Sequence, residues 1–144
     1  MSDIYADLRR DEGDVPYAYQ DSRGYWTIGV GFLIDRRLGA KLPTAVRDFW
    51  LNYLINEARA ELDRELPWWI TRPDDAQCAM LNMVYNLGIG RFMGFKKMIS
   101  CLQMGDYEGA AKHALDSKWA EQVPSRAHRI AAMYRNCATT GVTS

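Results

Sequence analysis

This sequence of 144 residues has few cysteines, no excess charge of either sign and no long apolar run. Its three cysteines, Cys78, Cys101 and Cys137, are widely spaced and include no Cys-x-x-Cys pair. They predict buried, reduced thiols and a reducing compartment during folding, not a disulfide framework. The histidines, cysteines and acidic residues also lack the spacing of metal ligands, so we expect no metal and no cofactor.

The balance of charge excludes further classes of function. Lys+Arg and Asp+Glu both number 18, and a neutral chain argues against nucleic acid as the main partner. A run of about 18 apolar residues would be needed to span a membrane, and none is present, so we expect no stable membrane insertion. The N-terminal stretch "MSDIYADLRRDEG" has no apolar core, so we expect no signal peptide.

The residues that are present predict a folded unit with two kinds of local structure. Hydrophobic residues make up 48% and charged residues 25%, which is typical of a globular domain. A first helix is expected over 2–11, with Ser2 as its N-cap. The aromatic and β-branched runs "YAYQD" and "YWTIGVG", separated by "SRG", predict a β-hairpin, and "GFLID" can add a third strand.

Helical periodicity dominates the remainder of the chain. We predict a long helix over 44–65 and a nearly all-apolar helix over 74–87, where Asp74 and Gln77 fit a capping box. Shorter helices are expected over 95–103, 106–115 and 124–136. The adjacent Trp68 and Trp69 are expected to pack rather than to stack on a ligand.

The predicted fold class is therefore α+β, in a single domain over 1–144. We expect a small N-terminal β-hairpin lobe at about 12–43, joined by the long helix, about 44–65, to a larger all-helical lobe. The helical lobe would comprise about 66–144 together with the first helix, 2–11. A cleft between two lobes is the default place for a ligand.

Three polar residues in the N-terminal region form a candidate catalytic group. If the hairpin loop is Ser22–Gly24, Asp21 pairs with Tyr25, and Asp21 and Thr27 become diagonal neighbours on one face. Glu12 stands at the end of the first helix, where the helix dipole disfavours its charged form. A protonated Glu near an ionised Asp is the pair that glycoside cleavage uses. Ordinary surface charges around a turn are the alternative interpretation.

The same region resembles a known family, the phage lysozymes of glycoside hydrolase family 24. Their signature is Glu, eight residues, an acid or Cys, five residues, then Thr, and this chain keeps both intervals at Glu12, Asp21 and Thr27. "GYWTIGVG", "CAMLNMVYNLG" and "GFKKMISCLQMGDYEGAAKHAL" also resemble family segments. "SKWAEQVPSRAHRIAAMYR" resembles the C-terminal run, so the resemblance covers most of the chain in order.

The resemblance implies a lysozyme-like fold and a muramidase activity. The enzyme would hydrolyse the β-1,4 bond between N-acetylmuramic acid and N-acetylglucosamine in peptidoglycan and cause host cell lysis. Glu12 would be the general acid, and Asp21 and Thr27 would position the water. Residues implied to bind substrate are Leu33, Tyr85, Asn86, His113 and Arg126.

The resemblance also implies partners and a location. Peptidoglycan glycan strands would be the substrate, and we expect a monomer. The protein would stay in the host cytoplasm until a holin releases it to the cell wall. Two other functions stay open: a lytic transglycosylase, which usually needs one acid and uses the sugar's own 6-hydroxyl, and a non-catalytic peptidoglycan-binding module.

One position departs from the family pattern. Phe32 stands where the T-even type carries a His that pairs with an Asp on the linking helix, and the aligned position here is Leu54. We therefore predict an apolar contact between Phe32 and the linking helix in place of a salt bridge.

Overall fold

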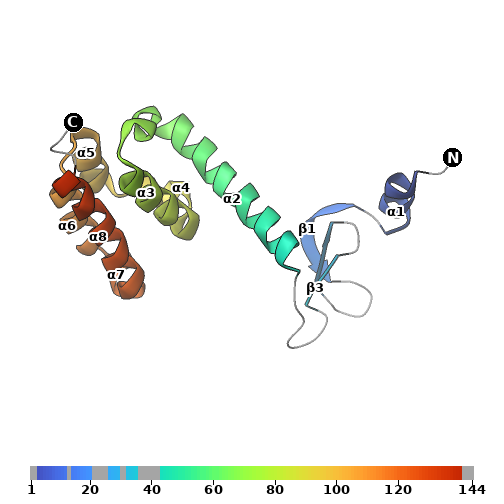
Figure 1. The fold of residues 1–144 in the computed structure, drawn as a ribbon. Helices are drawn as coiled ribbons and strands as arrows, with labels where there is room; N and C mark the ends of the chain where they lie inside the picture. Colours follow the sequence, from blue (N-terminus) through green and yellow to red (C-terminus); the bar gives the residue numbers. More distant parts are fainter. Residues whose placement is uncertain (1–2, 13, 21–25, 30–31, 36–42, 141–144) are drawn as a thin grey trace. The chain divides into compact units, whose positions relative to one another are not determined.

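The computed structural model describes residues 3–12, 14–20, 26–29, 32–35 and 43–140 (Figure 1). The chain divides into two units, Met1–Val46 and Arg47–Ser144. Each unit is described by itself below.

Unit 1 contains one helix and a small sheet. The helix α1 spans Ile4–Glu12. The Asp3 carboxylate accepts the backbone N–H groups of Tyr5 at 3.0 Å and Ala6 at 3.4 Å, so Asp3 caps the helix. The predicted cap, Ser2, lies outside the described residues.

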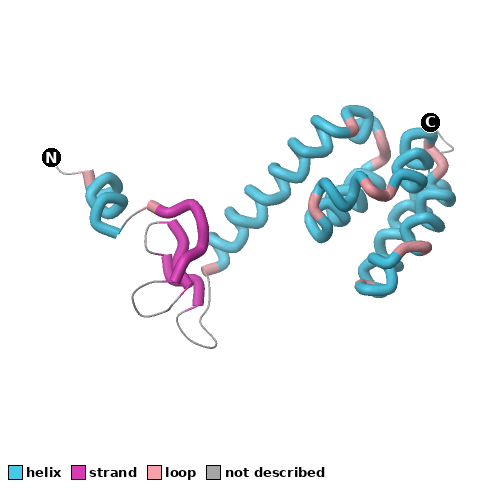
Figure 2. Tube along the Cα trace, turned by 180° about the vertical axis from the view of Figure 1, so that it is seen from behind, coloured by secondary structure: helices cyan, strands magenta, loops and turns pink. Residues whose placement is uncertain are grey.

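The sheet of unit 1 has three antiparallel strands in the order β1-β2-β3 (Figure 2). These strands are β1 (Val15–Gln20), β2 (Trp26–Gly29) and β3 (Phe32–Asp35). Gln20 pairs with Trp26 and Tyr19 pairs with Thr27, which is the register that a three-residue loop at 22–24 requires. The loop itself lies outside the described residues, together with Asp21 and Tyr25. A register shift between Val15 and Tyr19 marks an irregularity in β1.

Unit 2 begins within the long helix α2, Thr44–Glu65, whose bounds match the prediction. A 3-10 helix, η1 (Pro67–Thr71), then buries Trp69, whose indole N–H donates to the Asp63 carboxylate at 2.7 Å. Trp68 is half-buried, and the Arg72 guanidinium lies over its ring, 5.4 Å from the centroid. Both tryptophans therefore pack as the sequence predicted.

The other helices of unit 2 are α3 (Asp74–Leu87), α4 (Ile89–Met93), α5 (Lys96–Met104), α6 (Tyr107–Leu115), α7 (Lys118–Gln122) and α8 (Pro124–Thr140). Helix α8 packs mainly against α6, and also against α3 and α7, while α5 packs against α6. The long apolar segments were recognised from sequence. The short elements η1, α4 and α7 were missed because one turn or so of helix shows little periodicity.

Helix ends explain why these segments stop and start where they do. Gly105 takes a left-handed conformation with φ 79°, which closes α5, and Asp106 then caps α6 by accepting the Gly109 N–H at 3.0 Å. The capping box predicted at the start of α3 is wrong. Gln77 instead donates to the carbonyls of Ile70 and Arg72, at 3.0 and 2.7 Å, and so ties η1 to α3.

The hydrophobic core that the structure describes is built from helices and the turn of η1. Among the residues whose burial the structure describes, which exclude the strands, every buried hydrophobic residue lies between Ala58 and Cys137. The largest fully buried side chains are Trp69, Tyr134, Phe92, Leu62, Met80, Met83, Met98, Leu102, Ile130 and Cys137. Cys101 and Cys137 are free and buried, as predicted, whereas Cys78 is free and exposed.

The predicted α+β class, with its β-hairpin lobe, is therefore corrected. The structure is predominantly helical, and its described core is all-α because the residues that repeat at helical spacing are the ones that bury apolar surface. The strands are short, and the segment expected as a possible third strand does add β3 to the sheet. Helix α1 falls within unit 1, and its predicted membership of the helical lobe stays a prediction. The predicted contact of Phe32 with Leu54 would join the two units and stays a prediction.

Candidate functional site

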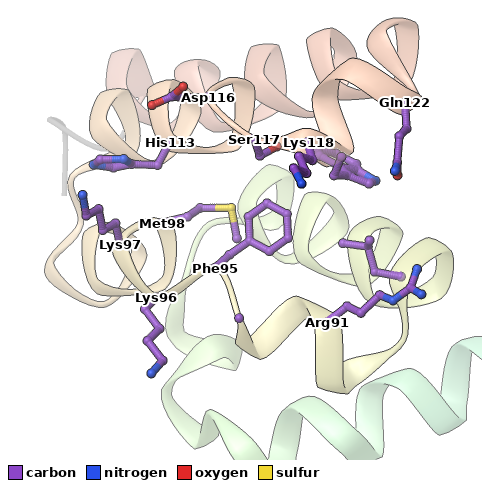
Figure 3. A pocket seen from close by; sticks show the side chains of 13 residues that line it. Arg91, Phe95, Lys96, Lys97, Met98, His113, Asp116, Ser117, Lys118 and Gln122 are labelled. Carbon is purple, nitrogen blue, oxygen red and sulfur yellow. The ribbon is translucent and has the colours of Figure 1, made fainter.

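A pocket of about 650 Å³ opens on unit 2 between the end of α3 and α7 (Figure 3). We name it the α4–α7 pocket. Its walls combine apolar side chains with cationic ones. The lining residues are Leu87, Arg91, Gly94, Phe95, Lys96, Lys97, Met98, His113, Asp116, Ser117, Lys118, Trp119 and Gln122.

An aromatic pair forms the apolar wall of the α4–α7 pocket. Phe95 and Trp119 meet edge to face, with ring centroids 6.0 Å apart and planes at 87°. Such pairs add to the stability that burial alone provides. Trp119 is only 5% exposed, and its indole N–H donates to the Asn86 carboxamide oxygen at 2.7 Å. That bond joins the end of α3 to α7 across 33 residues of sequence.

The start of α7 places Trp119 in this wall. The Ser117 hydroxyl donates to the Ala114 carbonyl at 2.7 Å and accepts the Ala120 N–H at 3.1 Å. Ser117 therefore ends the α6 segment and caps α7 with one side chain. Because a cap fixes where the first turn begins, the residue two positions later is held against Phe95 and Asn86.

Cationic side chains surround the apolar wall. Arg91, Lys96, Lys97 and Lys118 are exposed, and the acid among the lining residues is Asp116. None of the four cations belongs to the ion pairs found among the described residues. Figure 3 shows the Phe95 ring in the middle of the pocket, with Arg91 on one side of it and Lys97 and His113 on the other. The pocket thus presents an apolar surface within a positive rim.

Two of the predicted substrate-binding residues belong to this region. His113, half-buried on α6, lines the pocket, and Asn86 is bonded to the pocket residue Trp119. Tyr85 precedes Asn86 on α3 and is 51% exposed, but it does not line the pocket. Arg126 is half-buried in the first turn of α8 and is also outside the lining.

The predicted catalytic residues lie in unit 1. Glu12 is the last residue of α1, and Thr27 in β2 pairs with Leu33 in β3. Two predicted site residues, Thr27 and Leu33, are therefore directly opposite each other on neighbouring strands. Asp21 lies outside the described residues, and the catalytic group stays a prediction.

Sequence reasoning missed the cationic rim and the Asn86–Trp119 bond. The signal for the rim was present, since "GFKKM" and "SKW" each place lysines beside an aromatic residue. What the pattern did not contain was the packing of α5 against α6, which brings Lys96 and Lys97 to the same pocket as Lys118.

Within the described ranges, no group of three or more His, Cys, Asp or Glu side chains is arranged to hold a metal ion. Of the helices that the structure describes, none has the length and apolarity needed to cross a bilayer.

Comparison with known proteins identifies the family. The model of the phage lysozyme family matches residues 9–134, which is most of the chain. The protein therefore belongs to the phage lysozyme family.

Individual relatives differ in how much of their own length is shared. The pre-baseplate central spike protein Gp5 of Enterobacteria phage T4 is 29% identical over 85% of this chain, and the chain spans only 26% of that protein. Probable T4-type lysozyme 1 of Dictyostelium discoideum is 28% identical, with 90% of this chain and 92% of the relative covered. An endolysin of Acyrthosiphon pisum secondary endosymbiont phage 1 is 28% identical over 79% of this chain and 75% of its own.

Proposed function

We propose that the protein is a muramidase that hydrolyses the β-1,4 bond between N-acetylmuramic acid and N-acetylglucosamine in peptidoglycan. The observation that carries the proposal is the spacing of Glu12, Asp21 and Thr27, which lies inside the segment that matches the family model. Two relatives that are named lysozyme and endolysin match this chain over most of their own length, which supports the same activity.

In this proposal Glu12 donates a proton to the leaving glycosidic oxygen. Asp21 and Thr27 hold the attacking water, the carboxylate as base and the hydroxyl as a second hydrogen-bond partner. If the reaction inverts the configuration at the anomeric carbon, the carboxyl groups of Glu12 and Asp21 should lie about 6.5–9.5 Å apart. That distance leaves room for the sugar and the attacking water between them. The described pairs Tyr19–Thr27 and Gln20–Trp26 support the diagonal placement of Asp21 and Thr27 that this mechanism needs.

The helical unit would hold the glycan strand. Asn86 and His113, beside the α4–α7 pocket, offer hydrogen bonds to the acetamido and hydroxyl groups of the sugars, and Tyr85 offers an exposed ring. Leu33 and Arg126 complete the proposed substrate-binding set. We further propose that the protein acts as a monomer and reaches the wall from the host cytoplasm after a holin opens the membrane.

Turbidity clearing of chloroform-treated Gram-negative cells tests the role of Glu12. A general acid contributes a factor of ~10²–10⁴ to rate, so Glu12→Gln is expected to clear at least ~100-fold more slowly than the wild type. Asp11→Asn is the matched control, since Asp11 is an exposed acid on the same helix and its contact with Arg10 is a weak surface pair. Equal clearing by Glu12→Gln and Asp11→Asn would remove Glu12 from the mechanism.

The same preparations separate the two other functions. Mass spectrometry of digested peptidoglycan is expected to show reducing ends, and products with 1,6-anhydro ends would instead establish a lytic transglycosylase. A wild-type protein that sediments with peptidoglycan but releases no soluble product would be a binding module.

A further inference from the structure

The α4–α7 pocket has a charge that the proposed hydrolysis does not use. The pocket lies in unit 2, whereas the proposed proton donor and water-binding residues lie in unit 1. Its lining carries four Lys and Arg side chains against one carboxylate, in a chain whose formal net charge is +0. Such a local excess is expected to attract an anion.

The number and type of these cations favour a ligand with more than one negative charge. Arg91 presents a planar guanidinium that can bind two oxygens at once, and the lysines act as mobile point charges. A carboxylate carries a single charge, whereas a phosphate monoester carries about −1.5 to −2 near pH 7 and offers three acceptor oxygens. Several cations around one pocket therefore suit a phosphate better than a carboxylate.

The other lining residues indicate which chemical group carries the phosphate. The Phe95 ring projects into the pocket with Met98 beside it (Figure 3), and Leu87 adds to the apolar lining. An aromatic face with a few polar groups is the usual lining of a pocket for a ring-shaped polar ligand. His113 and Ser117 lie at the same pocket, where they can bond hydroxyl groups.

We propose that the α4–α7 pocket binds a phosphorylated sugar, with the ring against Phe95 and the phosphate at the rim formed by Arg91, Lys97 and Lys118. This site adds a phosphosaccharide ligand of the cell envelope to the activity proposed above. It does not depend on that activity, because binding needs neither Glu12 nor Asp21. The exposed position of the cations makes the binding weak and sensitive to salt.

Titration followed by heteronuclear NMR tests the site, with the intact chain and four probes. The probes are N-acetylglucosamine 1-phosphate, N-acetylglucosamine, inorganic phosphate and N-acetylmuramoyl dipeptide. The sugar phosphate is expected to bind with a Kd on the order of 1 mM and at least ~5-fold more tightly than each other probe, since among the four it alone joins a sugar ring to a phosphate. Raising the salt concentration from about 50 to 200 mM is expected to weaken this binding several-fold.

Variants locate the binding. A double variant, Lys97→Ala with Lys118→Ala, is expected to weaken sugar phosphate binding by about tenfold, because two charge-assisted contacts are lost. Lys112→Ala is the matched control, since Lys112 is an exposed lysine on α6 that does not line the pocket, and it is expected to change the Kd less than ~2-fold. Thermal denaturation of each variant verifies the fold.

Several results would overturn the proposal. Equal binding of inorganic phosphate would mean that the ring is not recognised, and equal binding of the dipeptide probe would mean a carboxylate site. No saturable binding, or equal losses in the double variant and Lys112→Ala, would mean that the rim is only a solvated cationic surface. Wall clearing is read separately, so loss of muramidase activity in Glu12→Gln leaves the outcome of these titrations intact.

Discussion

The hydrogen bond between Trp119 and Asn86 allows a quantitative test of how α3 and α7 are held together. The two side chains differ in exposure, since Trp119 is 5% exposed and Asn86 is exposed. Removing either partner breaks the same 2.7 Å bond, but the group left behind meets a different environment. The two single variants should therefore lose stability for different reasons.

In Asn86→Ala the indole N–H of Trp119 stays buried without an acceptor. An unsatisfied buried donor costs ~1–3 kcal/mol, so we expect the free energy of unfolding to fall by about 2 kcal/mol. In Trp119→Phe the exposed Asn86 oxygen is taken up by water, so the lost bond costs only ~1 kcal/mol. The smaller ring also gives up ~1–2 kcal/mol of apolar burial and packing.

A double-mutant cycle isolates the bond itself. Urea denaturation of the wild type, both single variants and the double variant is expected to give a coupling energy of about 1 kcal/mol. The control Asn82→Ala, at an exposed asparagine on the same helix, measures what Asn to Ala does without this bond and is expected to stay within ~0.5 kcal/mol. Additivity of the two single variants within ~0.3 kcal/mol would refute the coupling.

Two further predictions concern packing and pH. Gly109→Ala would bring its Cβ to 2.9 Å from the Cys101 Sγ and into the carboxylate that caps α6, so we expect a loss of ~1–3 kcal/mol, whereas Gly90→Ala meets nothing within 4 Å and should be neutral or slightly stabilising. Thermal denaturation compares the two variants, and equal stability would contradict the reasoning. Burial raises the pKa of Tyr134, so the unfolded chain ionises first above about pH 10 and wild-type stability falls there by up to ~1.4 kcal/mol per pH unit. The Tyr134→Phe variant lacks this ionisation, so its free energy of unfolding should fall less than that of the wild type above pH ~10. Parallel curves of stability against pH for the two proteins would contradict this role of Tyr134.

Particular elements show which parts of the fold the sequence patterns predicted correctly. The helix 44–65 was predicted with its observed bounds because its apolar residues repeat at helical spacing and Pro43 precedes it. The strand register followed from a short loop and alternation, and the described pairs Tyr19–Thr27 and Gln20–Trp26 agree with it. Local patterns of this kind depend on near neighbours in the chain, which is why they can be read without the fold.

The capping box at Asp74 failed for the opposite reason. Gln77 has the right spacing for that box, but the carbonyls of Ile70 and Arg72 are available to it once η1 turns back, and it donates to them instead. The α+β class also failed, because the three strands are short and most of the described residues are helical. For Gln77, the tertiary structure supplied a competing hydrogen-bond partner that the local sequence does not contain.

The sequence by itself determined the family, the spacing of the proposed catalytic residues and the long helices, because each depends on positions along the chain. Only the tertiary structure decided that Asn86 bonds to Trp119 and that Arg91, Lys97 and Lys118 share one pocket. These residues come from separate helices. Their proximity depends on how the helices pack and how Ser117 starts α7, which no local pattern encodes.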